Sequence, residues 1–283
     1  MSQKSYDGSP TLYLIPTPIG NMDDITYRTV KVLEEVDVVF CEDTRETGLF
    51  LNYLGIKKKL IANHEHNEAQ NHEKILEYLK DGKNVGLVSD RGTPVISDPG
   101  YELARFIIEE GYNVVALPGA TALIPALITS GLAPMPFLFY GFLNSKASKR
   151  EKELESLKSE RATMIFYEAP HRLQETLESL KKILGNNRKM TISREITKKY
   201  EEIYRGTIST LLEQNLELKG EMVLVVEGNK ENKDFSNLSL LEHISLYLED
   251  GMSKMDAMKQ VAKERNMKKS EVYNEYLKVE DTK

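Results

Sequence analysis

The chain has 283 residues, which is too long for one small core and suits two compact domains with a short appendage. Its 40% hydrophobic content is that of a soluble globular protein, and its formal charge of −6 excludes the strongly basic character of many DNA-binding proteins. The single cysteine, Cys41, excludes a disulfide framework within the chain and suits a reducing compartment, so we expect a cytoplasmic protein.

The first part of the chain alternates short apolar strands with helices. We predict strands at 11–16, 36–42, 84–89 and 112–119, and helices at 26–35, 44–53, 68–81 and 99–110. Strands that are apolar on both faces are typical of a parallel sheet covered by helices on two sides and joined by right-handed crossovers. Residues 1–118 are therefore expected to form an α/β lobe.

The chain has a different pattern from about residue 137, where long charged helices alternate with strands that include turn-linked neighbours. We predict strands at 161–170, 189–196, 201–208 and 221–228. Pro170 suits the first position of a helix whose Leu173, Leu177, Leu180 and Leu184 share one face. Residues 119–230 are expected to form a second α/β lobe, with the junction running through 119–142.

Residues 231–283 are expected to form a polar linker and a small helical tail. Ser253 and Ser270 are placed to cap two helices with apolar faces. A helix-turn-helix-like RNA module and a plain helical hairpin both agree with this pattern.

One charge-free segment, 111–145, contains a run long enough to cross a bilayer. Its four prolines would interrupt backbone pairing that lipid cannot replace, so we expect a buried junction and no membrane span. The first ten residues lack the basic start and apolar stretch of a signal peptide, and we expect none.

Four loops that follow predicted strands are rich in glycine, proline and small polar residues: 16–21, 41–47, 89–100 and 118–122. In an open α/β sheet, ligands bind at the carboxyl ends of the strands. Each loop alone is better explained by helix capping and turns, but four at one edge indicate a ligand site. Neither a G-x-G-x-x-G fingerprint nor a phosphate loop of the G-x-x-x-x-G-K-[ST] type is present, which argues against an ordinary dinucleotide or P-loop site.

A series of motifs carries a resemblance to a known family: PTPIGNMDDITYR, CEDTR, HEHN, SDRGTPVISDPGYELAR, PGATA, FYEAPHR, SREITKKYEE and GEMVLVVEG. In this order, from about residue 11 to 229, they resemble the small-subunit ribosomal RNA cytidine 2′-O-methyltransferases of the tetrapyrrole methylase superfamily. The resemblance implies a bilobal α/β enzyme that binds S-adenosyl-L-methionine between its lobes. It also implies a homodimer that methylates the ribose of a cytidine in the decoding centre of 16S rRNA, within the small ribosomal subunit.

The resemblance also implies which residues hold the cofactor. They are Pro18, Ile19, Asp90, Gly92, Thr93, Pro94, Ile96, Ala120, Thr121, Ala122, Phe142, Tyr167, Met222 and Val223. Arg91 and Val95 stand where the family is expected to have small residues. Because a cation against the sulfonium would be repelled, we predict that Arg91 points away from it, toward solvent, a carboxylate or the RNA backbone.

Methyl transfer to a 2′-hydroxyl favours a nearby proton acceptor. Asp23, Glu42, Asp43 and His171 are candidates, but Glu168 and Glu195 rank first because each ends a strand beside basic residues; simple pairing with those residues is the alternative. Local cations are expected to bind RNA phosphates: Lys146, Lys149, Arg150, Arg172, Arg194, Lys198 and Lys199.

Two other functions share much of this pattern. A small-molecule tetrapyrrole methylase would share the fold and the cofactor, and a non-catalytic ribosome-assembly factor would keep the cleft and bind S-adenosylmethionine without catalysing methyl transfer. CEDTR and EAPHR favour the RNA-directed branch. No metal is expected: His64 and His66 are two residues apart, no cysteine accompanies them, and the reaction needs no metal.

Overall fold

The computed structural model describes residues 3–5, 7–63, 68–216, 218–230, 238–249 and 251–280. His64 and His66, for which we expect no zinc site, lie outside these ranges. The chain divides into two compact units, Met1–Gly228 and Asn229–Lys283. The first unit contains two five-stranded sheets.

The first sheet is entirely parallel, with the strand order β3-β2-β4-β1-β5. Its strands are β1 (Thr11–Ile15), β2 (Val38–Cys41), β3 (Lys59–Ala62), β4 (Val85–Val88) and β5 (Asn113–Ala116). The helices between them are α1 (Tyr27–Glu35), α2 (Thr44–Tyr53), α3 (Glu68–Lys80) and α4 (Tyr101–Glu109). The predicted parallel α/β arrangement is confirmed, with one strand more than predicted, since β3 was missed.

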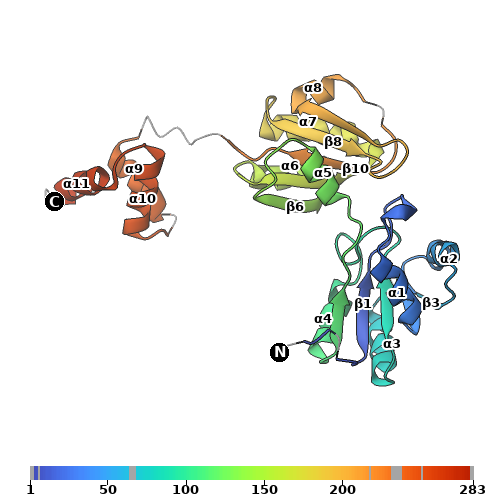
Figure 1. Cartoon of the computed structure of the whole chain (residues 1–283). Helices are drawn as coiled ribbons and strands as arrows, with labels where there is room; N and C mark the ends of the chain where they lie inside the picture. The colour runs from blue at the N-terminus through green and yellow to red at the C-terminus, as the bar shows by residue number, and fades with distance from the viewer. Residues whose placement is uncertain are drawn as a thin grey trace. The chain divides into compact units, whose positions relative to one another are not determined.

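Helices cover both faces of this sheet (Figure 1). On one face, α1 and α2 pack on a cluster that includes Ile15, Val39 and Val88. On the other face, α3 and α4 pack on Leu12 and Leu87 with their strand neighbours. This double cover explains why the strands read as continuous apolar runs.

The second sheet has the strand order β6-β7-β10-β8-β9, in which β6 and β7 are parallel and the other pairs antiparallel. Its strands are β6 (Phe137–Phe142), β7 (Thr163–Glu168), β8 (Lys189–Arg194), β9 (Glu202–Thr207) and β10 (Met222–Val226). Helices α6 (Ala147–Leu157), α7 (Leu173–Leu184) and α8 (Ile208–Glu213) pack on one face, and α5 (Leu123–Thr129) on the other (Figure 1).

The segment without charged residues forms β5, α5, β6 and the loops between them. None of the helices in the described parts of the chain has both the length and the apolar character of a membrane span. Pro170 begins a short 3₁₀ turn, Pro170–Arg172, ahead of α7, and the four leucines expected on one face of that helix are buried.

Arg150 corrects one expectation. We predicted an RNA contact, but its side chain on α6 is only 1% exposed. Its Nε donates to Ser179 Oγ at 3.0 Å, its Nη1 to the Ser145 carbonyl at 3.2 Å, and its Nη2 lies 3.4 Å from Glu175 Oε2. The guanidinium therefore joins α6 to α7, and its charge is not available to a surface ligand.

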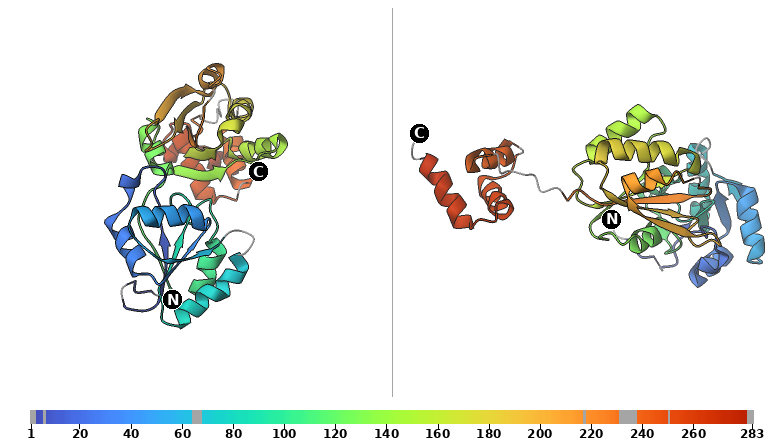
Figure 2. Two further views of the ribbon diagram at one scale, coloured as in Figure 1. Left: turned by 90° about the vertical axis from the view of Figure 1, so that its right-hand side faces the viewer. Right: turned by 90° about the horizontal axis from the view of Figure 1, so that it is seen from above.

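The tail unit contains helices α9 (Leu240–Glu249), α10 (Lys254–Glu264) and α11 (Lys269–Glu280), which pack together around Ile244, Val261 and Val272 (Figure 2). Ser253 caps α10 as predicted, since its hydroxyl accepts the Asp256 N–H at 3.2 Å. The predicted cap at Ser270 is wrong, because α11 begins one residue earlier. Helix α9 was not predicted. A helix-turn-helix-like role for this unit stays a prediction.

Candidate functional site

The loops that follow β1, β4 and β5 are hydrogen-bonded to one another. Thr17 and Gly92 exchange two backbone hydrogen bonds of 2.9 and 3.0 Å, which join the first loop to the third. The Thr93 hydroxyl donates to the Ala120 carbonyl at 3.1 Å, which joins the third loop to the fourth. The parallel sheet thus brings these loops to one edge, as its topology requires.

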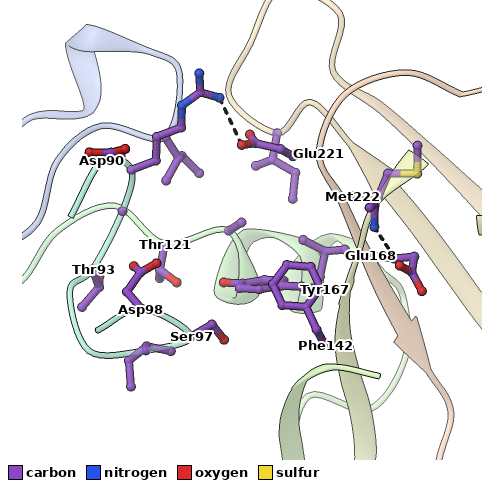
Figure 3. Close-up of a pocket in the computed structure, with 18 of the residues that line it drawn as sticks. Asp90, Thr93, Ser97, Asp98, Thr121, Phe142, Tyr167, Glu168, Glu221 and Met222 are labelled. Carbon is purple, nitrogen blue, oxygen red and sulfur yellow. Dashed lines mark hydrogen bonds and ion pairs between the residues drawn. The ribbon is translucent and has the colours of Figure 1, made fainter. Parts of the chain in front are cut away.

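A cavity of about 480 Å³ lies between these loops and the second sheet. Figure 3 shows Asp90, Thr93 and Asp98 on one side of it, and Phe142, Tyr167 and Glu168 on the other. Its lining includes these residues from the expected cofactor set: Ile19, Asp90, Gly92, Thr93, Ile96, Thr121, Ala122, Phe142, Tyr167, Met222 and Val223.

Three residues of the expected set do not line this cavity. Pro94 is buried, Ala120 offers its carbonyl to Thr93, and Pro18 lines a neighbouring cavity. In return the cavity wall contains Arg91, Ser97, Asp98, Ala169, Pro170, Ile196 and Glu221, which the expected set leaves out. Their motifs read as turns and helix starts, and only the fold shows that they share a cavity.

The third loop has a strained backbone where it passes the cavity. Gly92 has φ of +82°, and a Cβ there would lie 3.1 Å from Ile19 Cγ2. Val95 and Ser97 also have positive φ, 78° and 63°, which is costly for a side chain and most so for a β-branched one. Val95 therefore occupies a conformation that suits glycine, which explains why a small residue was expected there.

Aromatic side chains form the opposite wall. The Tyr167 ring meets Phe139 and Phe142 edge-on, with centroid distances of 4.9 and 5.6 Å. Burial raises the pKa of the Tyr167 hydroxyl, which stays protonated at neutral pH. Phe142 is 53% exposed at the cavity, so this wall offers a flat apolar surface to a planar group.

Asp98 is the most perturbed carboxyl group of the cavity. Burial, and secondly the negative charge of Glu42, raise its pKa to about 6, while a hydrogen bond from Ser89 opposes the shift. No lysine or arginine among the described residues forms an ion pair with it. A half-buried carboxylate without a cationic partner favours a cation in the ligand.

Of the three directions expected for the Arg91 side chain, the structure shows the one toward a carboxylate. Its Nη1 lies 3.0 Å from Glu221 Oε1, and this pair is drawn as a dashed line in Figure 3. Lys198 Nζ lies 2.8 Å from the other oxygen of Glu221 and 2.9 Å from Glu195 Oε1. We call Arg91, Glu221 and Lys198 the charged bridge, since they connect the two sheets' loops.

Both expected catalytic carboxylates are held by protein groups. Glu168 is buried; its carboxylate accepts from the Thr176 hydroxyl and the Ala169 N–H, and lies 3.4 Å from Arg172 Nε. Burial raises the pKa of Glu195, but hydrogen bonds from Lys198 and the Glu221 N–H outweigh it and lower the pKa below its usual value. The geometry agrees with the pairing alternative for Glu168, which lies beside Arg172. Glu195 is paired as well, but with Lys198, while its sequence neighbour Arg194 pairs with Glu202.

The expected RNA-binding cations divide into two groups. Lys146, Lys149 and Lys199 are exposed. Arg172 and Arg194 are partly buried and already have protein partners. Arg172 Nη2 donates to the Leu143 carbonyl at 2.6 Å, and Arg194 Nη1 lies 2.7 Å from Glu202 Oε2. Lys198 is likewise paired, within the charged bridge. Among the residues that the structure describes, no group of three or more His, Cys, Asp or Glu side chains is arranged to hold a metal ion.

Comparisons with known proteins agree with the motifs. Residues 11–212 match the family model "Tetrapyrrole (Corrin/Porphyrin) Methylases". "Ribosomal RNA small subunit methyltransferase I" of Bacillus subtilis (strain 168) is 46% identical over 285 residues, covering 97% of each chain. The protein of that name from Synechocystis sp. is 42% identical over 273 residues, covering 95% of this chain and 98% of its own.

A solved structure has a similar fold. The uroporphyrin-III-C-methyltransferase of Thermus thermophilus aligns with a TM-score of 0.56 and 20% identity, over 77% of this chain and 94% of its own. At this identity the similarity concerns the fold alone.

Proposed function

Because this chain belongs to the tetrapyrrole methylase family, we propose that it transfers a methyl group from S-adenosylmethionine to the 2′-hydroxyl of a cytidine in the decoding centre of 16S rRNA. The observation that carries the proposal is full-length identity of 40–46% to relatives whose names say that they methylate small-subunit ribosomal RNA. The motifs CEDTR and EAPHR favour an RNA substrate over a small molecule, and the cytidine 2′-hydroxyl is proposed from the resemblance of the motif series as a whole.

The main cavity has the chemistry that the proposed cofactor needs. S-adenosylmethionine supplies, when bound, an activated methyl group on a cationic sulfur. The aromatic wall of Phe142 and Tyr167 suits its adenine, and Asp98 suits its positive charge. The small residues of the loops allow close approach to the backbone, and the remaining contacts are assigned to Ile19, Asp90, Gly92, Thr93, Ile96, Thr121, Ala122, Met222 and Val223.

Positioning is proposed to supply most of the catalysis. Displacement at a methyl carbon needs the attacking oxygen, the carbon and the sulfur in line, and holding two reactants so contributes about 7–11 kcal/mol in favourable cases. Since protein donors already occupy Glu168 and Glu195, we assign them to holding strand ends and neighbouring loops in place. Residues of both sheets and their loops line the cavity, so the fold itself is proposed to set the angle of approach.

The proposed substrate requires contacts outside the cavity. Lys146, Lys149 and Lys199 are exposed and are proposed to bind RNA phosphates, a contribution that weakens as salt is raised. With the small ribosomal subunit as its substrate, the enzyme is proposed to act in the cytoplasm. A homodimer is proposed from the motif resemblance.

Titration with S-adenosylmethionine tests the proposed cofactor. We expect saturable heat with one site per chain for the wild-type protein, and at least tenfold weaker binding for Gly92→Ala, because a methyl group there strains the backbone and presses on Ile19. Gly82→Ala is the matched control: its φ of +79° is similar, but a Cβ there meets nothing within 4 Å.

Two results of this titration would count against the proposal. Absence of heat with a folded wild-type protein would contradict cofactor binding altogether. Equal weakening in Gly82→Ala and Gly92→Ala would show that the loss reflects general destabilisation.

A further inference from the structure

We propose that a second cavity, beside the first, binds the acceptor nucleotide of the RNA substrate; this rests on the function proposed above. The second cavity has a volume of about 470 Å³. Its lining includes residues of α2, the Asp90–Arg91 pair and Lys198.

The position of this cavity suits a methyl acceptor. Its walls come from the carboxyl ends of β1 and β4, from α2, and from Lys198 of the second sheet's loops. Asp90 and Arg91 line both cavities, so ligands in the two would be neighbours. Transfer between two bound reactants requires such adjacency.

One face of α2 provides an apolar wall. Glu46, Leu49, Phe50 and Tyr53 follow the i, i+3, i+4, i+7 spacing that places side chains on one side of a helix. Leu49 is 67% and Tyr53 65% exposed, which is unusual for large apolar groups on one helix face. A nucleobase stacks on surfaces of this kind without sequence preference.

The other side of the cavity has cationic groups. Arg91 and Lys198 share the carboxylate of Glu221, and both reach the cavity lining. A phosphate of the RNA can replace Glu221 as their partner, which would open the charged bridge between the two cavities. Glu46 and the Asp90 carboxylate offer acceptors for ribose hydroxyls or a base amino group.

The combination favours a nucleotide over other occupants. An apolar ligand would offer no negative charge to Arg91 and Lys198, and a purely anionic ligand would leave the apolar face of α2 without a contact. The cofactor is assigned to the first cavity, which holds most of the residues expected from the motifs. The remaining competitor, a second copy of this chain, is distinguished by the experiment.

Steady-state methyl transfer to small ribosomal subunits from cells that lack this gene tests the proposal, with labelled S-adenosylmethionine as donor. For Tyr53→Ala we expect kcat/KM for subunits to fall about tenfold or more, since removing a stacking aromatic has an effect of this order. Tyr53→Phe should restore it. Tyr27→Ala is the control, because Tyr27 is 98% exposed in the same lobe and lines neither cavity.

Affinity for S-adenosylmethionine and the mass in solution should be unchanged in all three variants. Wild-type-like transfer by Tyr53→Ala, or an equal loss in Tyr27→Ala, would overturn the nucleotide site while leaving the proposed function intact. Weaker cofactor binding by Tyr53→Ala would assign the cavity to the cofactor, and a changed mass would assign it to a second copy of the chain. No transfer by the wild-type protein would overturn both proposals.

Discussion

Replacing Asp98 with asparagine should weaken S-adenosylmethionine binding at least tenfold at pH 7.5 and remove most of its dependence on pH. The carboxyl has a pKa of about 6 because it is half-buried, with Glu42 and Asp90 adding negative charge; Ser89 donates to it and Tyr167 faces it. A bound cation stabilises the ionised form and lowers this pKa, so binding releases a proton near pH 6.

The direction of the pH dependence of affinity follows from this lowering of the Asp98 pKa by the bound cation. Wild-type affinity should be nearly constant above pH 7 and fall about tenfold between pH 7 and pH 5, because the carboxyl becomes protonated in the free protein over this range. Titration calorimetry in buffers of different ionisation heat measures both the affinity and the released proton. Asp81→Asn, at an exposed carboxylate beside Lys83, is the control. An unchanged pH profile in Asp98→Asn would contradict a role in cation binding.

Although Asp98→Asn should weaken cofactor binding, it should make the ligand-free protein more stable at neutral pH. Because the folded-state pKa is raised above 3.8, the folded state favours the protonated group. This contribution to stability is fully present below about pH 4 and is lost as the pH rises through 6. Asp98→Asn should therefore be more stable than the wild type at pH 7.5 and equal to it near pH 4, as measured by urea unfolding.

Replacing Arg150 with methionine should lower the free energy of unfolding by about 2–4 kcal/mol. The substitution removes the donor from the buried Ser179 hydroxyl, and a buried group left without its partner costs about 1–3 kcal/mol; it also removes the donor from the part-buried Ser145 carbonyl. The midpoint of urea unfolding, at an unchanged m value, measures the loss.

Lys149→Met is the matched control, since the neighbouring side chain is exposed and its loss should change stability by less than about 0.5 kcal/mol. If the two variants were equally stable and only Arg150→Met lost activity on RNA, the result would contradict the structural role and support the original expectation that Arg150 binds RNA. The two variants thus separate a structural cation from a surface cation of the same helix.

The sequence predicted some secondary-structure elements well and missed others. The alternation of apolar runs and helical spacing predicted the parallel sheet, because burial on both faces leaves a local signal. Strand β3 has only four residues, of which Lys59 is exposed and the others half-buried, so its pattern is too weak to recognise. Helix α9 was also missed, although Leu240, His243 and Ile244 have helical spacing, because it directly follows a polar stretch that was interpreted as a linker.

For the site, the motifs identified most of the main cavity but not Asp98, Glu221 or the face of α2. Asp98 precedes a proline and reads as a helix start; its burial depends on strands far away in the sequence. Arg150 and Lys149 are adjacent cations that only tertiary packing distinguishes. Charge is visible in a sequence, whereas the partner that neutralises it is a property of the fold.

Mapping 2′-O-methyl groups on 16S rRNA tests the central claim most directly. Small subunits from cells that lack this gene would be mapped before and after incubation with the purified protein and S-adenosylmethionine. The proposed function predicts that one cytidine of the decoding centre is unmethylated at first and gains a 2′-O-methyl group in the complete reaction only. Restoration of no ribose methyl group, or a methyl group on a base instead, would contradict it.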